Sequence, residues 1–202
     1  MSEREQWQKQ NSEYLAVALQ WLRLHLTKLA QVASPATTVL SSVAATGADE
    51  SAKKGWWKRF TPEGEKPEPK LLPPSSIESD LDQRIEAAAA RMKAIEDSDQ
   101  PPALTILSNT LGLSNFEKQI LLLCAALELD PQVAALCACI QSESQRSYPT
   151  FALAFQLFDE PTWDAVSPER PLRYWRLLEI NQPGAQPLMT SALRADERIV
   201  SI

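Results

Sequence analysis

The fold is decided by residues 111–131, which read LGLSNFEKQILLLCAALELDP. Gly112 is typical of a helix end, and Ser114 followed three residues later by Glu117 is the pattern of an N-terminal capping box. The helix that follows is apolar on nearly all sides, which predicts that it is buried. Asp130 followed by Pro131 is a strong start signal, because an N-cap acceptor precedes a proline at the first helical position. The stretch therefore predicts a buried helix between two others.

Further helix signals extend this pattern on both sides. A short apolar helix is expected to open at Pro102 and to end at Gly112, ahead of the buried helix. The helix that starts at Pro131 is expected to run to about Gln141, and a third helix is expected to begin at Thr150. The sequence thus predicts a cluster of short, closely connected helices in its second half.

The pattern then changes to that of a hairpin. Residues 172–180 (LRYWRLLEI) predict a helical turn that runs into a strand, and residues 186–190 (QPLMT) predict the return strand. Between them, Asn181 to Gly184 has the composition of a turn. The residues from Leu193 onward predict the beginning of a helix capped at Asp196. Helices followed by a two-stranded hairpin are the order of a winged-helix domain, which we expect over 101–202.

The N-terminal part predicts one long amphipathic helix over residues 3–33, within a segment 1–33. Its leucines recur at alternating spacings of four and three, as in a coiled-coil heptad seam. Such a seam has two interpretations: it packs within its own chain, or it binds a partner. The residues concerned are Leu15, Leu19, Leu22, Leu26 and Leu29.

A linker is predicted over residues 34–76, because this stretch is rich in small polar residues, proline and charge. It contains the basic and aromatic motif KKGWWKRF at 53–60, with Trp56 and Trp57 at its centre. The two tryptophans could dock to a partner, touch an anionic membrane surface, stack on single-stranded nucleic acid, or fold back on the globular part.

Residues 77–97 predict a second amphipathic helix with an apolar stripe and a charged opposite face. It could pair with the first helix as an antiparallel hairpin across the linker. The fold class is accordingly mainly α: a long N-terminal amphipathic helix, a disordered linker, a second helix and the winged-helix-like domain.

Charge and hydropathy exclude several classes of protein. Twenty Lys and Arg against 26 Asp and Glu give a net charge of −6, so the basic surface of a bulk nucleic-acid binder is missing. No apolar run approaches the roughly 20 residues of a membrane span, and the N-terminus is too polar for a secretory signal. We therefore expect a cytoplasmic protein for which membrane and nucleic-acid partners are disfavoured.

Motifs for catalysis and for metal binding are absent from the sequence. Its five glycines allow neither a P-loop nor a G-x-G-x-x-G motif, and it contains no H-E-x-x-H and no C-x-x-C. The single histidine, His25, is expected to be a packing residue, and Cys124, Cys137 and Cys139 are expected to be packed free thiols rather than zinc ligands. We expect no enzymatic activity, metal or cofactor in this chain.

Arginines near the hairpin leave a DNA-binding alternative open. Counted from the helix of the capping box, the helix expected from Thr150 is the third, the one that enters the major groove in many winged-helix proteins. It contains no Lys or Arg here. Arg170, Arg173 and Arg176 could share one face and contact a phosphate or an acidic group. The other interpretation is that they form salt bridges with the nearby carboxylates of Glu169, Glu179 or Asp164.

Several blocks of the chain resemble the N-terminal region of a group of bacterial AAA+ ATPases, those encoded with extracellular contractile injection systems. The blocks are LGLSNFEKQILLLCAALELDPQVAALCAC, YPTFALAFQLF, WDAVSPERPLRYWRLLEI and LRADERIV, with YLAVALQWLRLHL at the N-terminal side. The resemblance covers residues 14–33 and 104–200. It implies a winged-helix variant used for contacts, in a parent that hydrolyses ATP as a hexameric ring. It carries over no catalytic residue, and the ATP and magnesium of such a parent are expected only in an ATPase module beyond Ile202.

The sequence therefore predicts a non-catalytic segment of an AAA+ ATPase that recognises a protein partner or substrate. A free-standing adaptor, a DNA-binding regulator and a membrane-surface helix over 1–33 are the alternatives. We expect the linker to let the first helix search for a partner, so that removal of residues 1–76 leaves a folded winged-helix part. The residues predicted to bind a partner are Leu15, Leu19, Leu22, Leu26, Leu29, Trp56, Trp57, Arg173 and Arg176.

Overall fold

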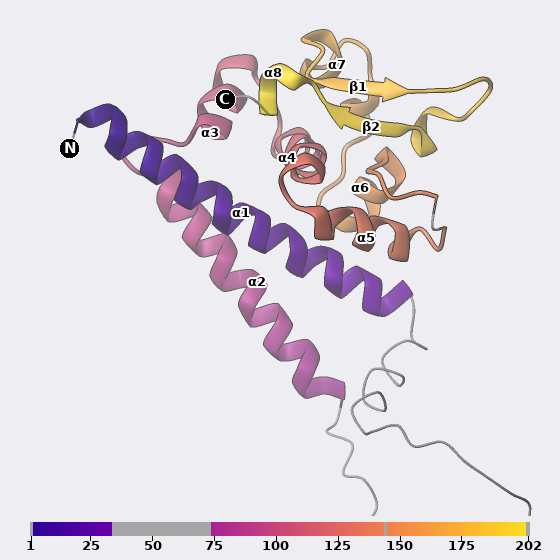
Figure 1. The fold of residues 1–202 in the computed structure, drawn as a ribbon, viewed down its shortest axis with the longest axis horizontal. Helices are drawn as coiled ribbons and strands as arrows, with labels where there is room; N and C mark the ends of the chain where they lie inside the picture. Colours follow the sequence, from indigo (N-terminus) through magenta and orange to yellow (C-terminus); the bar gives the residue numbers. More distant parts are fainter. Residues whose placement is uncertain (1, 34–73, 144, 201–202) are drawn as a thin grey trace, which may run out of the picture.

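The structure, a computed structural model, describes residues 2–33, 74–143 and 145–200 and is mainly helical (Figure 1). Helices followed by a two-stranded antiparallel sheet confirm the predicted class, a mainly α chain with a winged-helix-like part. The elements are α1 (Glu3–Ala33), α2 (Pro74–Glu96), α3 (Ala103–Leu111), α4 (Asn115–Leu129), α5 (Pro131–Ile140), α6 (Phe151–Leu157), the 3₁₀ turn η1 (Trp163–Val166), α7 (Pro171–Tyr174), β1 (Leu178–Asn181), the 3₁₀ turn η2 (Leu188–Thr190), β2 (Ala192–Ala195) and α8 (Glu197–Val200).

The two long helices, α1 and α2, pack side by side as an antiparallel hairpin (Figure 1). Lys28 near the end of α1 forms an ion pair of 2.6 Å with Asp82 in the first half of α2. Glu13 near the start of α1 forms one of 2.7 Å with Arg91 in the second half of α2. The predicted hairpin is therefore confirmed.

The predicted linker lies outside the described residues as far as position 73. α2 begins at Pro74, inside the segment 34–76 that the sequence predicts as linker. A proline is well tolerated in the first turn of a helix, because the N–H groups of that turn have no intrahelical acceptor. The proline-rich composition therefore placed the helix start three residues too late.

The helix signals of the second half are confirmed by the backbone and its caps. Gly112 ends α3 with φ 71° in the left-handed region, where a side chain would be strained. Ser114 and Glu117 form both hydrogen bonds of the capping box that opens α4. The side chains of Asp130 and Thr150 cap α5 and α6 in the same way, each by accepting a backbone N–H.

The wing differs from the prediction in its second strand. The sequence predicts the return strand at residues 186–190, but those residues include the single turn η2, and the strand is β2. Pro187 has no N–H to donate to a ladder, which disfavours a strand there. Leu193 and Ala195 are both buried, so they supply the inward-facing alternation that a strand needs. The backbone N–H of Leu193 also donates to the carbonyl of Pro149, which ties the wing to the start of α6.

The two strands pair antiparallel, in a register that aligns Leu178 with Ala195 and Ile180 with Leu193. The helix predicted to begin near Leu193 begins instead after β2, as α8. Its predicted cap is confirmed, since Asp196 Oδ1 accepts the backbone N–H two residues further on at 2.9 Å.

A single hydrophobic core joins α1 to the winged-helix elements. Tyr14, Leu22 and Leu26 of α1 are almost completely buried, in the same cluster as the apolar side chains of α4, α5, α6 and the wing. The expectation that α1 searches for a partner as a separate arm is therefore wrong in this structure, because its apolar face already completes the core.

A partly buried polar cluster fastens α1 to α2 and α4. The hydroxyl of Tyr14 donates to Glu96 Oε1 at 2.6 Å, and Lys118 Nζ donates to the same oxygen at 2.6 Å. Burial of Tyr14 raises the pKa of its hydroxyl above the ordinary value of 10.0, and the hydrogen bond to Glu96 raises it further. The folded chain therefore holds this proton more tightly than the unfolded chain does.

This proton makes stability depend on pH in the alkaline range. Above pH 10 the unfolded chain loses the Tyr14 proton and the folded chain keeps it, so the free energy of unfolding should fall by about 1.4 kcal/mol per pH unit from this group. The buried thiols of Cys124 and Cys137 add a fall of the same sign, because burial raises their pKa as well. In urea titrations between pH 10 and 11 the slope should therefore be smaller in Tyr14→Phe than in the native sequence, by the share that Tyr14 contributes. The matched control is Tyr174→Phe, which changes an exposed tyrosine and should keep the slope.

Candidate functional site

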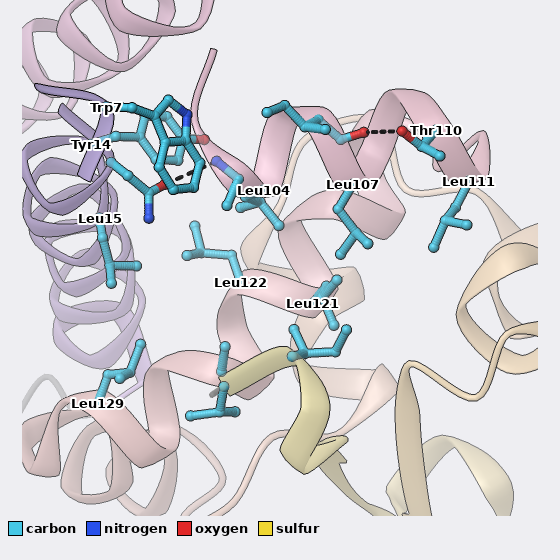
Figure 2. Close-up of a pocket in the computed structure, with 16 residues that line it drawn as sticks. Trp7, Tyr14, Leu15, Leu104, Leu107, Thr110, Leu111, Leu121, Leu122 and Leu129 are labelled. Carbon is cyan, nitrogen blue, oxygen red and sulfur yellow. Dashed lines mark hydrogen bonds between the residues drawn. The ribbon is translucent and has the colours of Figure 1, made fainter. Parts of the chain in front are cut away.

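An apolar groove lies beside the first half of α1. One face of that helix forms its first wall, with Trp7, Asn11, Tyr14 and Leu15 at helical spacing. In Figure 2 the side chains of Trp7, Tyr14 and Leu15 lie together at one side of the groove. Leu15 is thus the member of the predicted leucine seam that lines this surface.

The opposite wall of the groove is α3, its floor is α4, and α8 closes one end. The volume is about 430 Å³. Figure 2 shows Leu104, Leu107 and Leu111 of α3 and Leu121 and Leu122 of α4 around a common space. The remaining lining residues are Ala103, Ile106, Thr110, Ala125, Leu129, Ile199 and Val200.

The polar groups of the lining are largely used within the chain. Trp7 Nε1 donates to the carbonyl of Pro101 at 3.1 Å, and Asn11 Oδ1 accepts the backbone N–H of Ala103 at 2.9 Å. Thr110 Oγ1 donates to the carbonyl of Ile106 at 2.7 Å. The Tyr14 hydroxyl donates to Glu96, as described above. The groove therefore offers an apolar surface and no cluster of acids, bases or nucleophiles.

The rim of the groove exposes large aliphatic side chains. Ile106 on α3 is 43% exposed and Leu129 at the end of α4 is 40% exposed. The sequence contains no charged residue over 101–115, which includes all of α3. A surface helix without charge beside exposed aliphatic side chains is typical of an interaction surface. The sequence analysis did not single out this surface, although the charge-free run was a signal for it.

The other leucines of the predicted seam face the protein's own interior. Leu22 and Leu26 are fully buried, and Leu19 and Leu29 are partly buried against the same core. Of the two interpretations of the seam, these four side chains follow the first, because they pack within their own chain. The second predicted contact, Trp56 and Trp57, lies outside the described residues.

The three arginines near the hairpin do not form a common free surface. Arg170 Nη2 forms an ion pair of 2.7 Å with Glu117 Oε2, whose side chain is fully buried. Arg173 Nη1 donates to the carbonyl of Val166 at 2.8 Å. Arg176 is exposed and forms no ion pair with any residue that the structure describes. The partners expected from the sequence, Glu169, Glu179 and Asp164, are therefore wrong for Arg170 and Arg173.

The helix in the position of a DNA-recognition helix, α6, is mostly buried. Phe151, Leu153, Ala154 and Leu157 all face the core. Gln156 is the one residue of Phe151–Leu157 that is exposed. Neither a cation nor a row of polar side chains is presented to solvent by α6, so it lacks the groups that contact phosphates and base edges.

Exposed aromatic side chains that the sequence analysis did not predict lie on η1 and at the end of α7. Trp163, Tyr174 and Trp175 are each about half exposed or more. The rings of Tyr174 and Trp175 meet edge to face at 5.0 Å, and Trp163 contacts Phe155 at 4.8 Å. None of these three residues lines the groove.

The histidine and the cysteines are largely packing residues. The ring of His25 lies 4.4 Å from that of Trp21, and burial lowers the pKa of His25 below its ordinary value. Cys124 and Cys137 are buried free thiols, as predicted, and burial raises the pKa of Cys137 to about 12. Cys139 is exposed, contrary to the prediction. Within the described ranges, no three or more His, Cys, Asp or Glu residues gather in a way that could hold a metal ion.

Comparison with known proteins places the chain by its fold. A family model described as "Winged helix domain, variant" matches residues 7–202, which is nearly the whole chain. No curated protein and no solved structure matches it. In the described part of the chain no single helix is long and apolar enough to cross a membrane. The helices α4 and α5, which meet at an angle of 118°, reach that length and apolar composition only when they are taken together.

Proposed function

We propose that this chain, which belongs to the family of variant winged helix domains, is a non-catalytic segment that recognises a protein partner through the apolar groove. The groove is the observation that supports this function most directly. It combines a concave aliphatic floor with the exposed rim residues Ile106 and Leu129 and with a charge-free wall. Protein contacts of this kind gain free energy from apolar burial and need no catalytic group.

A winged helix also occurs in DNA-binding regulators, and this alternative is less well supported. α6 presents no cation, Arg170 and Arg173 are engaged within the chain, and the net charge is −6. Binding to DNA requires several cations that neutralise phosphates. Arg176 alone does not supply them.

We further propose that the recognition segment serves an AAA+ ATPase of the kind encoded with extracellular contractile injection systems. The resemblance of residues 14–33 and 104–200 to the N-terminal region of those ATPases supports this assignment. In this proposal, ATP and magnesium bind a separate ATPase module, that module assembles the hexamer, and the protein is cytoplasmic. The gene tests the proposal directly: an open reading frame that continues past Ile202 into a G-x-x-x-x-G-K-[ST] motif supports it, and a stop codon there contradicts it.

The role of the groove is tested by photo-crosslinking in the source cells. A photoreactive phenylalanine analogue replaces Ile106 in the groove rim, and the matched control places it at Asn109, which is exposed and does not line the groove. We expect the Ile106 position to give a discrete adduct with another protein and the Asn109 position to give none. Equal adducts at both positions, or none at either, would contradict recognition through the groove.

The DNA-binding alternative is tested on the same chain with labelled duplex DNA. A regulator should bind with an affinity that falls steeply as salt rises, and Arg176→Glu should weaken that binding. We expect no binding above that of an acidic control protein.

A further inference from the structure

The occupant of the groove must satisfy its own backbone hydrogen bonds. All lining segments are helical or next to a helix, and the polar groups described above are engaged within the chain. The two strands of the described sheet, β1 and β2, contribute no residue to the lining. An extended peptide buried there would leave its N–H and C=O groups without partners, which is costly. A helix has no such deficit, because its backbone groups pair with one another.

The α3 wall of the groove is complementary to an uncharged helix face. The wall over 101–115 carries no charge, so a charged side chain facing it would lose water and gain no ion pair. The volume of about 430 Å³ has room for roughly three groups the size of a benzene ring. An amphipathic helix presents about three apolar side chains over two turns, at i, i+4 and i+7.

A second copy of the chain fits the groove poorly. Among the described residues, the other large apolar side chains that are exposed are Val32 at the end of α1, Trp163 of η1, and Tyr174 and Trp175 at the end of α7. None of them forms a stripe along a helix of two turns or more. The described surface therefore offers the groove of a second copy no free apolar helix face.

We infer that the groove binds an amphipathic helix of a protein partner, with aliphatic residues at i, i+4 and i+7 and no charge on the face turned towards α3. This inference rests on the proposed function and names the chemistry of the partner. The helix would lie between α1 and α3 on the floor of α4, with Ile106 and Leu129 against its flanks.

The test uses the full chain and three probes. The first is a set of uncharged Ala/Gln peptides of about 18 residues, long enough to form helix, with Leu, Ile or Phe at i, i+4 and i+7. The second has the same composition with the apolar residues at alternating positions, so that no helix face is apolar. The third is dodecanoate. Binding is followed by isothermal titration, and helix formation by far-ultraviolet circular dichroism.

We expect at least one peptide of the first set to bind and become helical, and the alternating peptides to bind about tenfold more weakly or not at all. Ile106→Glu and Leu129→Glu should each weaken binding about tenfold or more, because each places a carboxylate in the apolar contact. Both positions are partly exposed, so both variants should fold, which their unfolding curves check. Asn109→Glu is the matched control and should bind normally.

Three results would overturn the inference. They are equal binding of the alternating peptides, binding of dodecanoate while every helical peptide fails, and self-association in sedimentation that Ile106→Glu abolishes. These failures are distinguishable from failure of the proposed function. A crosslinked protein partner at Ile106, together with failed helical peptides, keeps groove recognition and rejects only the helix.

Discussion

Removal of residues 1–33 is expected to unfold the whole chain. α1 places Tyr14, Val17, Leu22 and Leu26 in the same core as α4, α5, α6 and the wing. Their loss would expose that apolar surface to water, and each large side chain contributes about 1.5–3 kcal/mol when buried. A domain of ordinary stability cannot lose several such contributions and stay folded. The shortened chain should lose cooperative thermal unfolding and should bind a hydrophobic dye.

A single substitution in the intact chain provides a finer measurement. Leu22→Ala should lower the free energy of unfolding by about 2–5 kcal/mol, because it opens a cavity at a fully buried position. The matched control is Val32→Ala on the same helix, where the side chain is 73% exposed and the change should stay within about 0.5 kcal/mol. A shortened chain that still unfolds cooperatively would show that α1 is a separate arm after all.

Arg170→Leu is expected to be the most destabilising single change at a charged residue. Glu117 is fully buried, and its Oε2 accepts hydrogen bonds from Arg170 at 2.7 Å and from the backbone N–H of Ser114 at 2.8 Å. Without Arg170 the carboxylate stays buried next to no cation, a situation that costs about 3 kcal/mol or more. Urea denaturation of the variant and of the native chain measures the difference.

Glu117→Gln, which changes the other partner of the ion pair, should be less destabilising than Arg170→Leu. Combining the two substitutions tests whether the unpaired carboxylate causes the loss. Arg170 is 37% exposed, so it can turn to solvent when Glu117→Gln removes the charge, and the glutamine oxygen can still cap α4. In the double variant Glu117→Gln/Arg170→Leu, stability should recover relative to Arg170→Leu alone, because no buried charge remains. Equal losses in the single and double variants would show that the effect comes from packing rather than from an unpaired carboxylate.

The local elements could be predicted because their signals act over a few residues. The capping box of Ser114 and Glu117, the cap at Asp130 and the end at Gly112 each depend on hydrogen bonds or backbone angles within one turn. The start of α2 and the second strand were misplaced. Pro74 and Pro187 each lack a backbone N–H, so the sequence shows only that one hydrogen bond cannot form there. Whether a helix or a strand begins beside them depends on the neighbouring elements.

The candidate site could be predicted only in part. The heptad spacing correctly indicated a helix with an apolar seam, but spacing does not say what covers the seam. Leu22 and Leu26 face the core and Leu15 lines the groove, and this division depends on where α3, α4 and α5 lie against α1. The charge-free run over 101–115 was visible in the sequence, but it had no meaning until α3 was seen to form a wall.

The sequence by itself determined the helical character of this protein, the caps of its short helices and the presence of a hairpin after them. These properties follow from periodicity, from local hydrogen bonding and from which residue types are present. The tertiary structure alone decided that Arg170 neutralises Glu117, 53 positions away, and that α1, α3, α4 and α8 leave an apolar groove between them. Both depend on the packing of elements that are distant in the chain. A gap between helices is a property of their arrangement, which no single segment encodes.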